Sequence, residues 1–313
     1  RSKQYREQGV WGEWMVVAGY LGLIHREGWR LDVAERLAGE MAEVANRHLS
    51  PSDPRQAIPH LLNAHLAVEE FELERALQQA EQAVHFVGNS IGLEELRVRS
   101  WAVLGYVHDV RGDYRKAIEA YRRGMESALQ IESSETRLYM LTRVTNNLGV
   151  ALRKSGKYEE AMEQYRLNRE YLLQLYDEDH PEVARNLNNI GSILFRNGDI
   201  LSAAGHFIQA ANLFEERYGR DHKSVAAAYN NAGTALLKIE DHDEALRYLK
   251  RALGIKIRLL GEEHLETGIG YSNLASAYAM QGELEMALDH YDQSLRIREQ
   301  GLGPAHPGLI RPL

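Results

Sequence analysis

The stretch "NLNNIGSILFRNGD", residues 186–199, contains the pattern on which the fold depends. It reads as a helix with a glycine, Gly191, in its middle, although a helical glycine costs about 1 kcal/mol relative to alanine. Two asparagines, Asn188 and Asn189, stand just ahead of that glycine. The rest of the chain supplies a reason for both features.

Gly191 belongs to a series of small residues that recurs at steps of 41 to 44 positions. The members of this first series are Gly22, Ala64, Gly105, Gly149, Gly191, Gly233 and Ala275. Twelve residues after each of them comes an alanine: Ala34, Ala76, Ala117, Ala161, Ala203, Ala245 and Ala287. Such a fixed period indicates an array of similar supersecondary units.

The two series predict pairs of antiparallel helices in close contact. A small residue in the middle of one helix, opposite a small residue early in the next, lets the two backbones approach. Glycines that can adopt the left-handed cap conformation fall between the two series, at Gly112, Gly156, Gly198 and Gly282. Alternating β-branched runs are absent, so we expect no strands. The chain is therefore predicted to be all helix.

The order of residues in each unit resembles the tetratricopeptide repeat (TPR). Trp101, Leu104, Gly105, Ala117 and Tyr121 carry this resemblance in one unit. The period departs from the usual 34 residues, and this longer form, with "LNNIG" and "DHPEVA", is similar to the TPR arrays of kinesin light chains and related bacterial proteins. The resemblance implies an all-α, right-handed superhelical solenoid of about seven helix-turn-helix repeats.

The period divides the chain into regions of unequal regularity. We expect a lead-in at 1–10, two divergent TPR-like hairpins at 11–98, five well-matched repeats (about 99–140, 141–179, 180–221, 222–263 and 264–300), and the start of a further repeat or a truncated cap at 301–313. HEAT, armadillo and WD40 repeats have similar periods. The small residue followed twelve positions later by alanine favours TPR, and WD40 blades would need strands. Because the sequence opens with Arg1 rather than Met, we expect a fragment of a longer chain.

The resemblance implies that the first helix of each pair lines a concave groove, and it places the asparagines there. An asparagine amide both donates and accepts hydrogen bonds, so a column of asparagines can pair with the backbone of an extended peptide. The predicted groove residues are Arg143, Asn146, Asn147 and Arg153 in the fourth unit, Arg185, Asn188, Asn189, Ser192 and Arg196 in the fifth, Asn230, Asn231 and Thr234 in the sixth, and Asn273 in the seventh.

The arginines among these residues, with Lys154 and Lys238 near the rim, predict a locally positive groove that suits a peptide with carboxylates. The alternative is that the asparagines only connect adjacent repeats. In the N-terminal units the comparable positions are apolar, for example Ile58, Leu61 and Val68. These residues pack on something outside the chain or form a hydrophobic pocket in the groove.

Composition and spacing exclude several other classes of function. A net charge of −8 argues against binding to nucleic acid, and no apolar stretch is long enough for a membrane span. The chain has no cysteine. His180, His222, His264 and His306 recur every 42 residues, but equivalent residues of successive repeats cannot converge on one metal ion. We therefore expect these histidines at helix starts, with no metal site.

No catalytic constellation or cofactor loop is recognisable, so we expect a non-enzyme without cofactors. The sequence predicts a cytoplasmic TPR scaffold whose groove binds a protein or peptide partner. The alternatives are a peptide-sensing regulatory array, or the sensor domain of a larger signalling protein such as a kinase or nucleotide-dependent switch. The oligomeric state and the identity of the partner stay open.

Overall fold

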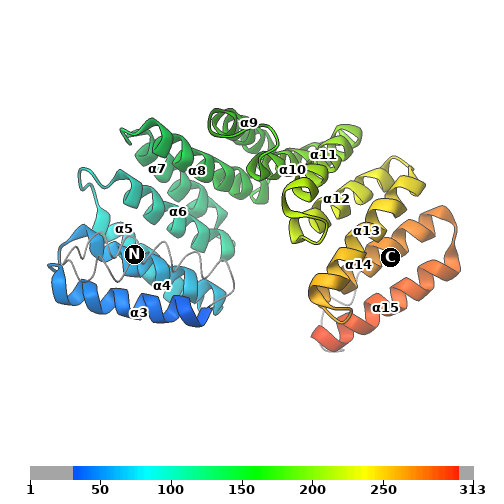
Figure 1. Ribbon diagram of the computed structural model, residues 1–313, viewed down its shortest axis with the longest axis horizontal. Coiled ribbons are helices and arrows are strands. Elements are labelled where there is room, and N and C mark those ends of the chain that lie inside the picture. Colours follow the sequence, from blue (N-terminus) through cyan, green and yellow to red (C-terminus); the bar gives the residue numbers. More distant parts are fainter. Residues whose placement is uncertain (1–30, 303–313) are drawn as a thin grey trace. The chain divides into compact units, whose positions relative to one another are not determined.

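The chain is all-helical over the residues that its structure, a computed structural model, describes, which are 31–302 (Figure 1). It divides after Leu175 into two units, and each is described by itself. The N-terminal unit contains α3 (Leu31–His48), the short 3-10 helix η1 (Pro54–Gln56), α4 (Ala57–Glu69), α5 (Leu73–Val87), α6 (Glu94–Val110), α7 (Tyr114–Leu129), α8 (Ser134–Lys154) and α9 (Tyr158–Leu175). The C-terminal unit contains α10 (Pro181–Arg196), α11 (Ile200–Tyr218), α12 (Lys223–Lys238), α13 (His242–Leu260), α14 (Leu265–Gln281) and α15 (Leu284–Leu302).

Consecutive helices pack as hairpins, as the two series of small residues predict. The hairpins are α4–α5, α6–α7 and α8–α9 in the N-terminal unit and α10–α11, α12–α13 and α14–α15 in the C-terminal unit. Helix α3 packs against α4 and carries Ala34, so it takes the place of a second helix. Gly22, the first helix expected for that unit, the lead-in and residues 303–313 lie outside the described residues. Across residues 31–302 no strand occurs, which removes the WD40 alternative.

The turns within the hairpins use the glycines that the sequence places there. Gly112, Gly156, Gly198 and Gly282 have φ angles of 82°, 82°, 88° and 88°. These values lie in the left-handed region, which costs residues with a Cβ atom about 1–2 kcal/mol. Each glycine therefore lets one helix end and the next begin within a few residues.

The small residues are where the two helices of a hairpin meet. All the alanines of the second series are buried, and Ala161 and Ala203 are fully inaccessible. A Cβ atom on Gly149 would lie 2.5 Å from the ring of Tyr165. One on Gly191 would lie 2.9 Å from the ring of Phe207 and 3.3 Å from the carbonyl oxygen of Ala203. The glycine thus gives up helix propensity for close packing, and this prediction is confirmed.

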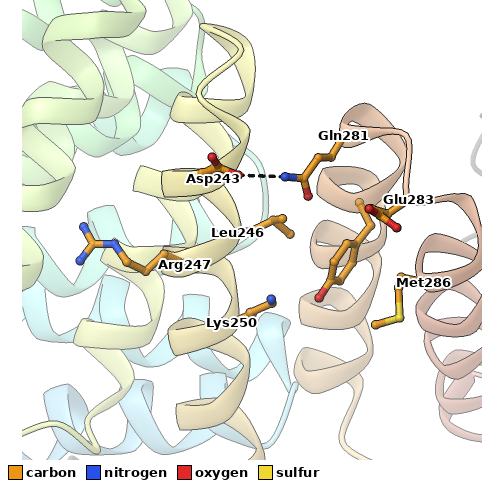
Figure 2. A pocket seen from close by; sticks show the side chains of 8 residues that line it. Asp243, Leu246, Arg247, Lys250, Gln281, Glu283 and Met286 are labelled. Atoms are coloured by element: carbon orange, nitrogen blue, oxygen red, sulfur yellow. Dashed lines mark hydrogen bonds between the residues drawn. The ribbon is translucent and has the colours of Figure 1, made fainter.

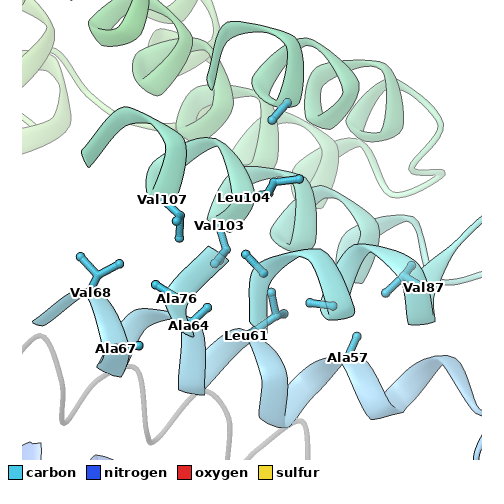
Figure 3. Packing of buried hydrophobic residues seen from close by; sticks show 13 residues of the cluster. Ala57, Leu61, Ala64, Ala67, Val68, Ala76, Val87, Val103, Leu104 and Val107 are labelled. Atoms are coloured by element: carbon cyan, nitrogen blue, oxygen red, sulfur yellow. The ribbon is translucent and has the colours of Figure 1, made fainter. Parts of the chain in front are cut away.

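The apolar positions of the N-terminal hairpins belong to the core. Leu61 and Val68 on α4 are 8% and 6% exposed and share one hydrophobic cluster with Val103, Leu104 and Val107 on α6 (Figure 3). The structure therefore favours neither of the two sequence-based explanations for these positions. They are buried between the first helices of two successive hairpins.

Candidate functional site

The predicted groove residues of the C-terminal unit lie on the first helices of its hairpins. Asn188 and Asn189 are on α10, Asn230 and Asn231 on α12, and Asn273 on α14, and all are half-buried. In this unit α12 and α14 contact one another directly. In the N-terminal unit the same kind of contact joins α4 to α6 and α6 to α8. First helices therefore lie beside first helices, as a groove lined by them requires.

The asparagines connect successive hairpins through their side chains. The Nδ2 atom of Asn231 donates to the Oδ1 atom of Asn188 at 3.0 Å, and Nδ2 of Asn273 donates to Oδ1 of Asn230 at 2.8 Å. We call these four residues the amide ladder. In each pair the donor lies 43 residues after the acceptor and on the next first helix. These hydrogen bonds show that some of the periodic asparagines connect adjacent repeats.

Some polar groups of the amide ladder and its neighbours remain available for further hydrogen bonds. Asn188 and Asn230 use only their Oδ1 atoms, so within residues 31–302 their Nδ2 groups carry no hydrogen bond. One turn further on, the hydroxyls of Ser192 and Thr234 donate to the carbonyl oxygens of Asn188 and Asn230 at 2.9 and 2.8 Å. Their oxygens can still accept. Each helix thus presents a donor and an acceptor four residues apart.

Arg185 lies in the second turn of α10 and Arg196 is its last residue, and both are exposed. Arg185 forms an ion pair with Glu182 at 3.1 Å, and its side chain is 51% exposed. An exposed pair of this kind contributes about 0–1 kcal/mol, so a stronger anionic partner can replace Glu182. The i, i+3 spacing of the two residues would have allowed this pair to be predicted from the sequence.

In the N-terminal unit the four predicted residues lie together on α8. Arg143 is exposed, with its guanidinium 5.9 Å from the ring centroid of Tyr139. Asn146 donates to the neighbouring Asn147 at 3.2 Å. Arg153 is half-buried beside Tyr165. Burial raises the pKa of this tyrosine to about 12, and the positive charge of Arg153 opposes that shift.

One of the predicted rim cations is neutralised. Lys154, next to Arg153 at the end of α8, forms an ion pair with Asp109 on α6 at 2.6 Å. The side chain of Asp109 is only 10% exposed. The positive charge expected near this rim is therefore smaller than the residue types alone suggest.

The periodic histidines that the structure describes begin helices. The Nδ1 atoms of His180, His222 and His264 each accept a hydrogen bond from the backbone N–H two residues later, at 3.2, 3.1 and 3.1 Å. His306 lies outside the described residues. Over residues 31–302 no group of three or more His, Cys, Asp or Glu side chains is arranged to hold a metal ion.

The cap formed by His222 predicts a dependence of stability on pH. Burial, followed by the charge of Lys223, lowers the pKa of His222 below 6.5. The unfolded chain therefore binds a proton at a higher pH than the folded chain does, so stability falls as the pH drops from above 6.5 through the folded-state pKa. Protonation also removes the acceptor lone pair that caps α12.

We expect His222→Asn, which caps a helix without titrating in this range, to make the loss of stability between pH 7.5 and 5.5 less steep. Urea unfolding at several pH values measures this. Some dependence remains, because burial also lowers the pKa values of His108 and His290. An unchanged slope in His222→Asn would contradict the assignment.

A second feature, which the sequence analysis did not predict, is an open cleft of about 580 Å³ between α13, the end of α14 and the start of α15 (Figure 2). Leu246, Tyr278 and Met286 form its apolar part, and Nζ of Lys250 lies 5.2 Å from the ring centroid of Tyr278. Nε2 of Gln281 donates to Asp243 at 2.9 Å and joins α14 to α13. The cleft combines both signs of charge and favours no single ligand class.

None of the helices described between residues 31 and 302 is sufficiently long and apolar to span a membrane.

Comparison with known sequence families identifies the repeat. A sequence model described as "Tetratricopeptide repeat" matches residues 141–216, 183–258 and 224–300, and a second model with the same description matches residues 98–130. Together these matches cover more than half of the chain. Comparison with curated proteins gave no match.

Several solved structures share the fold. BtubC (BKLC) from P. vanneervenii is 25% identical, with a TM-score of 0.62, over 79% of this chain and 96% of that one. A putative kinesin light chain with nearly identical TPR-like repeats from Podospora anserina is 20% identical, with a TM-score of 0.57, over 68% of this chain and 99% of that one. A Rap protein in complex with competence and sporulation factor is 16% identical, with a TM-score of 0.67, over 92% of this chain and 77% of that one. The last two likenesses concern the fold alone.

Proposed function

Because the chain belongs to the tetratricopeptide repeat family, whose fold suggests protein–protein interaction, we propose that it is a non-catalytic interaction module of the cytoplasm that binds an extended peptide segment of a partner. The binding surface is the face formed by the first helices. The amide ladder carries this proposal, since Asn188 and Asn230 combine a fixed orientation with amide donors that have no partner among the described residues.

The geometry of the ladder suits the backbone of a peptide. The hydrogen bonds from Asn231 and Asn273 hold the Oδ1 atoms of Asn188 and Asn230, so the Nδ2 groups are oriented before a ligand arrives. Preorganisation of this kind lowers the cost of ordering side chains on binding. A peptide unit offers one carbonyl and one N–H group, and the Asn amide and the Ser or Thr hydroxyl one turn away match these two groups.

The charges near the ladder favour a peptide that carries carboxylates. Arg185 and Arg196 flank the ladder on α10, and Arg185 is held only by an exposed ion pair with Glu182. The planar guanidinium group binds carboxylates through two parallel hydrogen bonds. An acidic side chain of the peptide would therefore have a partner at the end of α10.

The test separates the two roles of the asparagines. Replacing both Asn188 and Asn230 by aspartate keeps the oxygens that accept from Asn231 and Asn273 but removes the Nδ2 donors and adds negative charge. Loss of two net hydrogen bonds of about 0.5–1.5 kcal/mol each weakens binding about 5- to 150-fold. Acidic peptides selected from a random display library against the wild-type chain supply the probe, and fluorescence anisotropy measures their affinity.

The matched control is Asn212→Asp, because Asn212 is an exposed asparagine on the second helix α11. This variant should bind the selected peptides as the wild type does. Circular dichroism checks that each variant stays folded. If the peptides bind the Asn188→Asp/Asn230→Asp variant with wild-type affinity, the ladder connects repeats and does not contact a ligand.

A second candidate function is peptide sensing, in which a bound peptide changes the dimensions of the array. The likeness of the fold to a Rap protein solved with competence and sporulation factor favours it. Each repeat contacts only its neighbours, so a small change at each junction accumulates along the array. X-ray scattering with and without a selected peptide tests this: sensing predicts a changed radius of gyration, and a static scaffold an unchanged one.

A further inference from the structure

The last described helix, α15, lies at an outer edge of the C-terminal unit (Figure 1) and carries a group of exposed leucines. Leu284, Leu288 and Leu295 are 65%, 63% and 45% exposed. They recur at steps of four and seven residues. This spacing places all three on one side of a helix, as in the contact row of a coiled coil.

In the preceding hairpin the equivalent row of residues, on α13, is covered by another helix. Leu246 and Leu253 on α13 lie 42 residues before Leu288 and Leu295, and each is only 6% exposed. A Cβ atom on Gly270 of α14 would lie 3.0 Å from Leu253, so α14 packs directly on this row. The equivalent row of α15 is therefore a helix-packing surface, and its natural occupant is another helix.

The charges beside the row select the direction of that helix. Asp289 and Asp292 are exposed in the first part of α15, and Arg296 follows them on the same flank. Arg296 is held only by an exposed pair with Glu263 at 3.3 Å. A second α15 in antiparallel orientation would bring the same flank, with its arginine, next to these carboxylates. In a parallel pair this flank would face the opposite flank of the partner helix, so the two sets of charges would not meet.

We propose that α15 is a dimerisation surface, on which the α15 helix of a second copy of this chain packs in antiparallel orientation. Leu288 of one copy then lies opposite Leu295 of the other. Such an interface is symmetric, so every contact occurs twice. One pair of helices buries a small area, and we expect a dissociation constant on the order of micromolar.

Sedimentation velocity over a series of concentrations tests the proposal on the complete 313-residue chain. The wild type should shift from monomer to dimer with rising concentration. Replacing Leu288 and Leu295 by glutamate should weaken association about tenfold or more, since central apolar contacts dominate small interfaces. The matched control is Leu201→Glu, because Leu201 is 72% exposed on α11 and belongs to no such row.

Crosslinking tests the orientation, and the absence of natural cysteines makes it simple. Two single variants, Leu288→Cys and Leu295→Cys, are mixed and oxidised. The antiparallel arrangement predicts a disulfide between the two different chains, and a parallel arrangement predicts disulfides between identical chains.

Three results would overturn the proposal: a wild type that stays monomeric at every concentration, a dimer that Leu288→Glu/Leu295→Glu leaves unchanged, or crosslinks between identical chains only. The variant Leu309→Glu/Ile310→Glu gives a further check. If the chain dimerises only in this variant, its own residues 303–313 are the natural occupant of the α15 face, and the proposal is wrong.

Discussion

Replacing Tyr165 by alanine is expected to lower the free energy of unfolding by about 3–5 kcal/mol, as for other large buried aromatic residues. Tyr165 is completely buried, and its ring lies against Gly149 in the hairpin α8–α9. The cavity cannot collapse easily, because the opposite position has no side chain that could move into it. Most of the loss should therefore persist after relaxation.

Urea unfolding measures the total effect, and hydrogen exchange locates it. Because repeats interact only with their neighbours, protection should fall most in α8 and α9 and less in hairpins further away. Tyr165→Phe keeps the ring and loses only the hydroxyl beside Arg153, so it should cost about 1 kcal/mol.

Tyr139→Ala is the matched control for this experiment. Tyr139 lies on α8 in the same hairpin, but it is 37% exposed, and its ring centroid lies 5.9 Å from the guanidinium group of the exposed Arg143. Its loss should cost less than about 1 kcal/mol. If Tyr165→Ala cost no more than Tyr139→Ala, close packing at Gly149 would not be what holds the hairpin together.

The fold could be predicted from the sequence because its determinants recur. Gly191 and Ala203 mark one helix contact, and the same spacing marks it again in every later hairpin, so a weak local signal becomes strong by repetition. The turn glycines and the histidines at helix starts could be predicted for the same reason, because they also recur with the period. The burial of Leu61 and Val68 was harder to predict, because it depends on the position of α6 relative to α4, which is a matter of tertiary structure.

The candidate site was only partly predictable. The sequence placed Asn188 and Asn230 on the first helices of their hairpins, where the structure has them, but the hydrogen bonds that join them to the next hairpin depend on the distance between α10, α12 and α14. One signal was present: the paired asparagines are 43 residues apart, one more than the period, in both pairs. The ion pair between Lys154 and Asp109 joins two hairpins, and no spacing in the sequence indicated it.

Replacing Gly149 by alanine is expected to destabilise the chain by about 1–3 kcal/mol, the usual cost of overpacking a core. The new methyl group would lie 2.5 Å from a ring carbon of Tyr165, too close for any real contact, and that ring is completely buried. Gly205→Ala is the matched control. Gly205 is exposed in the second turn of α11 with no atom near its Cβ position, so this variant should gain about 0.5–1 kcal/mol from helix propensity.

The sign of the Gly149→Ala effect should depend on Tyr165. In the Tyr165→Ala background the ring is gone, and the methyl group should fill space instead of competing for it. The hairpin α4–α5 already has this combination, with Ala64 and Ala80 at the equivalent positions and both fully buried. A double-mutant cycle measured by urea unfolding should therefore give a coupling of about 1–3 kcal/mol. Equal costs of Gly149→Ala in both backgrounds would mean that the glycine is needed for its backbone and not for the ring that it admits.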